Sequence, residues 1–220
     1  MFLFQVFPVL LLCGHVYSGV ASKSNRTHPI SADIVPVTFV GNVAPIQAPA
    51  FWTGALQGDT RIYYQNADGG IQATGISGPL TSGTFIFTQA LVPASQVQGN
   101  TPIAAVTINE AAFQAVRFRV HLAHIGMQVH VFFVSPSNIL SEYIFSEATG
   151  WRGGPSCTDC IDVQGFVVQS GNRVLYAMAN EEAGSLALLR VGFVSAGAPD
   201  TLSEADFDAQ NGWRLAQMIG

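Results

Sequence analysis

The chain has 220 residues, of which 49% are hydrophobic and only 10% charged, against about 25% charged residues in typical globular proteins. Its net charge is −5 and it has no block of Lys or Arg, which excludes the basic footprint of proteins that bind nucleic acids or anionic membranes. The 22 Gly and 11 Pro indicate many turns. This composition is typical of extracellular all-β proteins that bind neutral ligands.

The first residues have the pattern of a secretory leader. Residues 2–13 are almost wholly apolar, which is about the length of a signal h-region and too short to span a bilayer. Small residues follow, so we expect a signal peptide over residues 1–21, secretion, and an N-terminal extension over residues 22–46. Because no Lys or Arg precedes the apolar run, the alternative is a buried strand of a truncated gene model.

Short β-type runs separated by turn-forming residues follow the extension. They occupy residues 61–65, 103–108, 129–134, 173–177 and 189–194. The motif Leu-Ser-Glu recurs at residues 140–142 and 202–204, and Gly-Trp-Arg recurs at residues 150–152 and 212–214. A repeat of about 50–60 residues with four strand-like runs predicts β-propeller blades. We therefore expect an all-β fold with about three blades, near residues 47–98, 99–165 and 166–220.

One segment breaks the repeat. Residues 116–128 lengthen the link between the first two strands of the second unit. The segment fits a long hairpin loop, an alternative edge strand or a translated intron. Its His121 and His124 suggest a metal site, but we see no third ligand and expect no metal.

The two downstream cysteines form a Cys-x-x-Cys motif, Cys157 and Cys160. A zinc site would need two more ligands, and the sequence has no second pair of cysteines. A thioredoxin-like motif would open a helix in a βαβ unit, and that pattern is missing. We favour a loop disulfide in an oxidising compartment over two free thiols.

The ordered blocks resemble the blades of fungal fucose-specific lectins of the Aleuria aurantia type. The blocks are IAAVTI (103–108), VHVFFV (129–134), NILSEY (138–143) and GWRGG (150–154), with RIYYQ (61–65) similar to an opening blade. The resemblance covers roughly residues 50–218. It implies a six-bladed propeller with fucose pockets between blades, no cofactor, and multivalent dimers. Because only about three blades are visible, either two chains close one ring or the sequence is a fragment, half of a ring.

In this family each pocket takes an Arg from the second strand of a blade, a Glu from the third, and an aromatic wall largely from the adjacent blade. The resemblance implies these ligand-binding residues: Arg190, Glu204 and Trp213 in the third blade, Glu142, Trp151 and His130 in the second, and Arg61 in the first, with Phe145 and Phe207 as further wall residues. His130 stands where an Arg is expected. In the first blade Ala73 replaces the Glu, and Leu80 falls near the Trp position.

These residues suit a sugar because a guanidinium donates to adjacent oxygens while a carboxylate accepts from hydroxyls. We predict a lectin for fucosylated glycans that is not an enzyme and forms a homodimer, and a weaker, pH-sensitive pocket at His130. One alternative is a propeller glycosidase, which needs two carboxylates about 5–9.5 Å apart. Another is a degenerate homologue without sugar affinity, in which the repeated Trp, Glu and Arg residues are structural.

Overall fold

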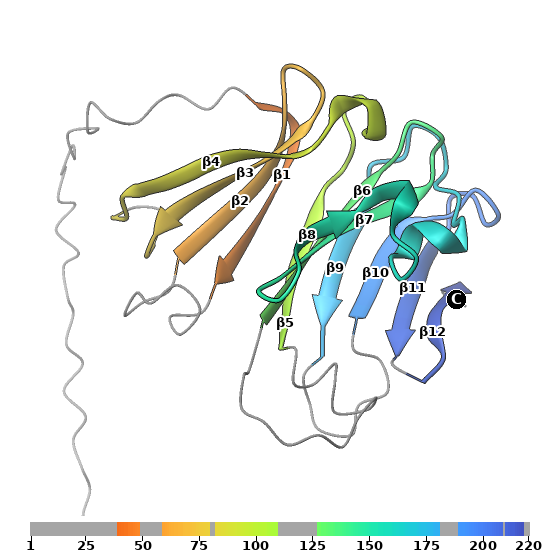
Figure 1. Ribbon diagram of the computed structural model, residues 1–220. Coiled ribbons are helices and arrows are strands. Elements are labelled where there is room, and N and C mark those ends of the chain that lie inside the picture. The colour runs from red at the N-terminus through yellow and green to blue at the C-terminus, as the bar shows by residue number, and fades with distance from the viewer. Residues whose placement is uncertain are drawn as a thin grey trace, which may run out of the picture. The chain divides into compact units, whose positions relative to one another are not determined.

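The computed structural model describes residues 39–48, 59–79, 82–109, 127–180, 189–208 and 210–217. These residues form three four-stranded antiparallel sheets, each built from four strands consecutive in the sequence (Figure 1). The expected leader and residues 116–126 of the predicted insertion lie outside the described part of the chain. No helix among the described residues is long and apolar enough to cross a membrane. The prediction of an all-β fold with about three blades is confirmed.

The bounds of the strands follow the order of the chain. The first sheet comprises β1 (Phe39–Ala48), β2 (Asp59–Asn66), β3 (Ile71–Ser77) and β4 (Phe85–Val92). The second comprises β5 (Ala104–Asn109), β6 (Met127–Val134), β7 (Leu140–Ser146) and β8 (Gly150–Gly153). The third comprises β9 (Leu175–Ala179), β10 (Leu189–Val194), β11 (Leu202–Asp208) and β12 (Gly212–Gln217). Short 3₁₀ turns lie at η1 (Ala94–Gln96), η2 (Gly154–Ser156) and η3 (Ile161–Gln164).

The first sheet begins earlier than the sequence pattern suggests. β1 starts at Phe39, inside the region expected to be an N-terminal extension, and residues 49–58 lie outside the described part of the chain. This strand contains Pro45 and an irregular register between Val40 and Val43. Because of these two features its sequence lacks the regular pattern of a β-strand. β1 is an edge strand of its sheet, where a Pro is tolerated because one side of the strand has no ladder partner.

Strand β6 contributes to the two larger hydrophobic clusters of the described residues. Its side chains at Val129, Val131 and Phe133 belong to a cluster shared with the first sheet, whereas Phe132 and Val134 belong to a cluster shared with the third sheet. This division follows from the alternation of side chains between the two faces of a strand. The second sheet is therefore packed on both faces, which explains why β6 reads as a continuous apolar run.

Repeated tryptophans join neighbouring sheets. Trp151 on β8 meets Tyr63 of the first sheet edge to face, with ring centroids 6.1 Å apart. Trp213 on β12 meets Phe132 of the second sheet in the same way at 6.0 Å. Each such aromatic pair contributes about 0.5–1.5 kcal/mol beyond the burial of its area. The fourth strand of one sheet thus packs, through its tryptophan, against the second strand of the preceding sheet.

Candidate functional site

Strand pairing places corresponding residues of the three sheets at equivalent points. In each sheet one residue of the second strand pairs with a residue of the third strand. The third-strand residue two positions before that partner has its side chain on the same face of the sheet. We call these two points the basic position, on the second strand, and the acidic position, on the third. The basic positions are Arg61, His130 and Arg190, and the acidic positions are Ala73, Glu142 and Glu204. The strands that carry them are those that the resemblance implied.

In the third sheet both polar groups are present and accessible. Arg190 Nε donates to Glu204 Oε1, and Arg190 Nη2 donates to Glu204 Oε2 at 2.9 Å. The Arg190 side chain is 47% exposed and that of Glu204 is 16% exposed. Both residues line a cavity of about 260 Å³ together with Ser203 and Asp206. A guanidinium and a carboxylate at one cavity can donate to and accept from neighbouring hydroxyl groups.

Tyr176 completes this arrangement and was missed in the sequence. The second-strand residue opposite the acidic position is Tyr63 in the first sheet and Phe132 in the second, but it is Gly192 in the third. A Cβ at Gly192 would lie 2.0 Å from the Tyr176 ring, so Tyr176 on β9 fills this space. Its hydroxyl donates to Glu204 Oε2 at 3.1 Å. The available signal was a Gly where the repeat carries a large aromatic residue.

The charges of this cluster are set by its own contacts. Burial alone would raise the pKa of Glu204, but the hydrogen bonds and charge of Arg190 and the hydrogen bond from Tyr176 outweigh it, so the pKa lies below its usual 4.5. The hydrogen bond to Glu204 also raises the pKa of Arg190. Burial, followed by the neighbouring charge of Glu204, raises the pKa of Asp206. Arg190 and Glu204 therefore both stay charged at neutral pH.

In the second sheet the corresponding pair is buried. The side chains of His130 and Glu142 are each 1% exposed, and His130 Nδ1 lies 2.6 Å from Glu142 Oε1. His130 Nε2 lies 3.2 Å from Gln128 Oε1. Glu142 Oε2 accepts a hydrogen bond of 3.0 Å from the backbone N–H of Ile161. The structure thus brings the two predicted residues together, but it gives them partners within the protein.

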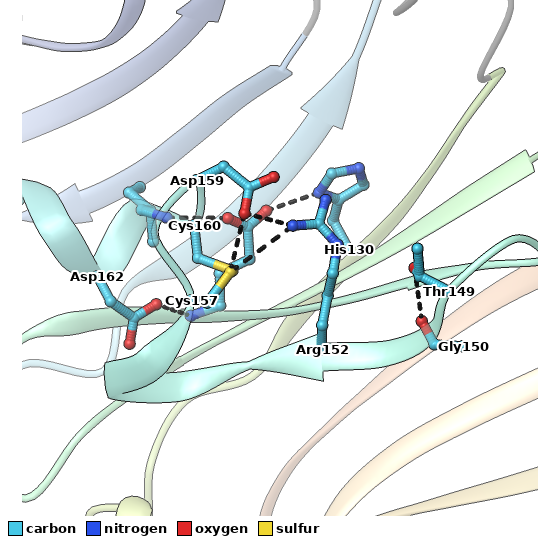
Figure 2. Close-up of a disulfide and its surroundings, with 10 residues drawn as sticks. His130, Thr149, Gly150, Arg152, Cys157, Asp159, Cys160 and Asp162 are labelled. Atoms are coloured by element: carbon cyan, nitrogen blue, oxygen red, sulfur yellow. Dashed lines mark hydrogen bonds and ion pairs between the residues drawn. A yellow bond between two sulfur atoms is a disulfide. The ribbon is translucent and has the colours of Figure 1, made fainter.

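The segment that covers this pair is held by a disulfide. Cys157 and Cys160 are bonded (Figure 2), which confirms the disulfide favoured from the sequence over free thiols. The 3₁₀ turn η3 follows directly, and its Asp162 accepts a hydrogen bond of 2.9 Å from the backbone N–H of Glu142. Burial raises the pKa of Asp162. The disulfide-linked segment, residues 157–164, therefore closes over the acidic position of the second sheet.

The first sheet keeps only the guanidinium. Arg61 occupies the basic position, while Ala73 at the acidic position is buried. Arg61 Nε lies 3.4 Å from the carboxylate of Asp59 on the same strand. Its Cζ lies 5.8 Å from the ring centroid of Phe87 on β4, within the range of a cation–π contact. Arg61 is thus held by residues of its own sheet.

Trp213 does not lie where the resemblance implied. It is paired with Phe207, three residues beyond Glu204, and an odd spacing along a strand places side chains on opposite faces. Trp213 therefore cannot wall the cavity of Arg190 and Glu204, and the expectation that it serves that pocket is corrected. It lies instead against the second sheet, where its side chain is 8% exposed.

The cavity between the second and third sheets receives this indole. It has a volume of about 300 Å³, and its lining includes His130, Glu142, Arg152, Asp159, Phe207 and Trp213. Phe207 lies at the wall of this cavity. Phe145 and Trp151 face the first sheet in the equivalent way, with their ring centroids 5.3 Å apart.

At the position equivalent to the two tryptophans, the first sheet carries Phe85. Leu80, which the sequence placed near this point, lies outside the described residues.

The sequence was compared with protein families and with curated proteins. No family model matches it, and no curated protein matches it.

Solved structures give a likeness in fold. The structure of AofleA from Arthrobotrys oligospora superposes with a TM-score of 0.57 at 19% sequence identity, covering 84% of this chain and 43% of that chain. An AofleA mutant with three arginines replaced by alanine gives the same values. The SapL1 lectin in complex with alpha methyl fucoside matches with a TM-score of 0.42 at 13% identity, covering 86% of this chain and 67% of that one. This chain thus spans less than half of the AofleA chain, with which it shares its fold.

Proposed function

We propose that this protein is a secreted lectin that binds L-fucose on fucosylated glycans, with Arg190 and Glu204 as its main polar partners. The observation that carries this proposal is the accessible, two-pronged ion pair of these residues at the equivalent point of a repeated sheet. The resemblance of the repeated sequence blocks to Aleuria-type lectins supports the choice of fucose.

The chemistry of this pair suits a sugar with adjacent hydroxyls. Two N–H groups of Arg190 point to Glu204, and a guanidinium has five N–H donors in all. The remaining donors are available to sugar oxygens, while the carboxylate accepts from a sugar hydroxyl. Tyr176 fixes one oxygen of Glu204, so less conformational freedom is lost when the ligand binds.

A second copy of the chain can supply the missing aromatic wall. Trp213 covers the corresponding cavity of the second sheet from the third sheet, and the first sheet carries Phe85 at the same register position with 59% of it exposed. We propose a homodimer in which the first sheet of one copy meets Arg190 and Glu204 of the other. A Phe85→Ser variant should then have half the mass of the wild type in solution, and equal masses would contradict this pairing.

Glycoside hydrolysis is the main competing activity, and the geometry disfavours it. Asp206 lies two residues beyond Glu204 on the same strand, and its carboxylate is 3.9 Å from Arg190 Nε. A retaining glycosidase holds its carboxyl groups about 5–5.5 Å apart and an inverting one holds them further apart. Both carboxylates here lie beside the same guanidinium of Arg190 and not on two sides of a cleft, so we propose binding without catalysis.

Calorimetric titration with methyl α-L-fucoside tests this function. Arg190→Ala and Glu204→Gln should each weaken binding at this site by about tenfold or more, because a hydrogen bond to a charged group contributes about 1.5–3 kcal/mol. The exposed Arg173 provides a charge-matched control, and Arg173→Ala should bind as the wild type does. A wild-type protein that fails to bind the fucoside would refute the lectin function and favour a structural role. Release of fucose from an aryl fucoside would instead favour glycoside hydrolysis as the activity.

A further inference from the structure

A cavity with no role in the proposed fucose site lies at the end of the second sheet where β6 turns into β7. Its volume is about 420 Å³, and its wall comes from Phe133, from the turn over residues 135–139 and from the 3₁₀ segments η1, η2 and η3. No strand of the first or third sheet is among the described residues of this wall. The cavity between the second and third sheets shares only Val163 of this lining, so the two are distinct.

Asp162 is the one charged residue among the described residues of this wall. Its Oδ2 accepts a hydrogen bond of 2.9 Å from the backbone N–H of Glu142, but it forms no ion pair with a described side chain. Burial, and to a smaller extent the charge of Glu142, raises the pKa of Asp162. Because a cation stabilises a carboxylate that is partly withdrawn from water, this wall suits a ligand with a positive group.

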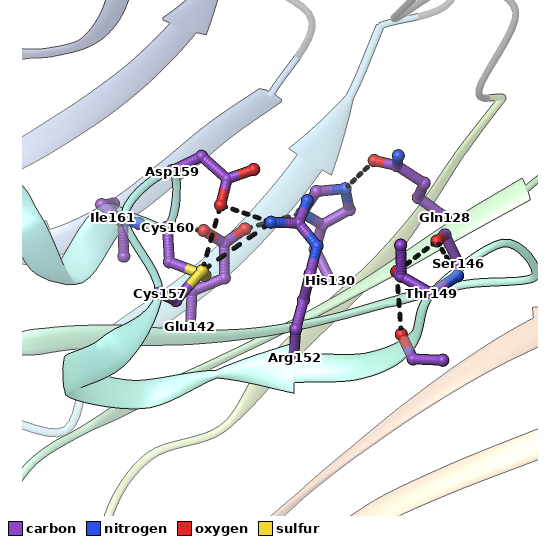
Figure 3. A network of polar contacts seen from close by, with 11 residues as sticks. Gln128, His130, Glu142, Ser146, Thr149, Arg152, Cys157, Asp159, Cys160 and Ile161 are labelled. Carbon is purple, nitrogen blue, oxygen red and sulfur yellow. Dashed lines mark hydrogen bonds and ion pairs between the residues drawn. A yellow bond between two sulfur atoms is a disulfide. The ribbon is translucent and has the colours of Figure 1, made fainter.

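The basic side chains around the disulfide-linked segment are already engaged. Arg152 Nη1 donates to Asp159 Oδ1, and His130 Nδ1 lies 2.6 Å from Glu142 Oε1 (Figure 3). Neither Arg152 nor His130 lines the cavity. The described residues thus leave the carboxylate of Asp162 open to a positive group of a ligand.

Segment η1 adds hydrogen-bond donors to the same wall. Gln96 Oε1 accepts a hydrogen bond of 2.9 Å from the Tyr143 hydroxyl, so the side-chain N–H groups of Gln96 are the donors left for a ligand. A Cβ on Gly154, whose φ is +71°, would lie 2.5 Å from Gln96 Oε1, so this Gly lets η2 approach the amide closely. Ser95 and Ser137 add hydroxyl groups. The wall therefore combines a negative acceptor with donors for hydroxyl oxygens.

We propose that this cavity binds an amino sugar, a hexose-sized ligand with a free ammonium group and several hydroxyls. The ammonium donates to the carboxylate of Asp162, the amide of Gln96 donates to a sugar oxygen, and the C–H groups of the ring pack against Pro136 and Pro155. The volume of about 420 Å³ is near the lower end of small-molecule pockets, which suits a monosaccharide. This inference concerns a separate cavity and does not depend on fucose binding.

Calorimetric titration of D-glucosamine into the full chain at about pH 6.5, below the ordinary pKa of an amine, tests this site. We expect D-glucosamine to bind about tenfold or more tightly than D-glucose or N-acetyl-D-glucosamine, because only the charged ligand makes the hydrogen bond between ions. Asp162→Asn keeps an oxygen for the Glu142 N–H but loses the charge, so it should weaken glucosamine binding by the same factor. Glu147→Gln, at an exposed residue outside this wall, should bind glucosamine as the wild type does.

A second variant leaves the carboxylate in place. Ser137 is exposed at the cavity wall, so Ser137→Trp should fill the space and abolish glucosamine binding even if Asp162→Asn proves unstable.

The outcomes separate this site from the fucose site. The amino-sugar site is overturned if the wild type binds glucosamine no better than glucose, or if Asp162→Asn and Ser137→Trp, melting like the wild type, still bind it equally well. Displacement of glucosamine by methyl α-L-fucoside would place both sugars in one cavity and would also overturn it. A wild type that binds glucosamine but not the fucoside would refute the lectin proposal alone.

Discussion

The second and third sheets carry the same pattern of strands and put it to different uses. At equivalent points the third sheet exposes Arg190 and Glu204, while the second sheet buries His130 and Glu142. The difference arises outside the repeat, because the disulfide-linked segment lies over the second sheet and donates a backbone hydrogen bond to Glu142. A repeated motif therefore fixes where a side chain lies, but the segment that follows decides whether a ligand can reach it.

Removing the acid should affect stability in one sheet and binding in the other. Glu142→Ala leaves His130 and the Ile161 N–H without their partner in a buried place, so we expect a loss of about 3 kcal/mol in the free energy of unfolding. Glu204→Ala removes a partly exposed ion pair and should cost less than about 1 kcal/mol. Urea denaturation followed by circular dichroism measures both. Equal losses of unfolding free energy for the two variants would contradict the difference in burial between the Glu142 and Glu204 pairs.

The glycine of the third sheet is a more specific point of difference. A methyl group at Gly192 would meet the ring of Tyr176 at 2.0 Å, so Gly192→Ala should destabilise the fold by about 1–3 kcal/mol through overpacking. It should also weaken fucoside binding, because Tyr176 would be displaced from Glu204. Gly197 has only ordinary contacts at 3.7 Å, and Gly197→Ala should change the unfolding free energy by less than about 0.5 kcal/mol. Thermal melts of both variants check this.

The acid limit of binding should follow Glu204. Its pKa in the folded protein is lowered below 4.5, so its ion pair with Arg190 contributes to stability above the unfolded-state pKa and is lost as the pH falls through the folded-state pKa. We expect the fucoside affinity of the Arg190 site to be constant from pH 7 to about 4.5, the ordinary pKa of Glu, and to fall only below that. Calorimetric titrations at a series of pH values measure this, and an affinity that already declines above pH 4.5 would show that the pKa of Glu204 is raised and not lowered.

The smallest effect concerns the hydroxyl of Tyr176. Tyr176→Phe removes one hydrogen bond to Glu204 while keeping the ring that covers Gly192, so affinity should fall only by severalfold, in line with about 0.5–1.5 kcal/mol for a neutral hydrogen bond. The acid limit of binding should move to higher pH, because this hydrogen bond helps to lower the pKa of Glu204. An affinity and a pH profile identical to those of the wild type would show that the ring alone matters.

Much of the fold was predictable from the sequence because the repeat consists of short motifs that are local in the chain. Leu-Ser-Glu and Gly-Trp-Arg recur at the same spacing, and the strands they mark form the third and fourth strands of two sheets. The start of the first sheet was not predictable in this way, because β1 carries Pro45 and an irregular register. An edge strand tolerates both features, so its sequence is weakly constrained.

The sequence predicted the strands that carry the polar groups of the candidate site, but not the face of the sheet on which its aromatic residues lie. Arg190 and Glu204 were placed correctly on adjacent strands, since the repeat aligns them with His130 and Glu142. The sheet served by Trp213 depends on its pairing with Phe207, which the sequence does not fix. The ion pair of Arg152 with Asp159 was not predictable from the Gly-Trp-Arg motif, because it depends on the fold of the disulfide-linked segment.

The alternation of β6 between two cores has a consequence for how the protein comes apart. Val131 and Phe132 are neighbours in the chain, yet each belongs to a different seam between sheets. If β6 itself unfolds, both seams open together, whereas loss of the first or the third sheet opens one seam only. We therefore expect the amides of β6 to exchange with a higher opening free energy than those of β2 and β10, which each border a single seam.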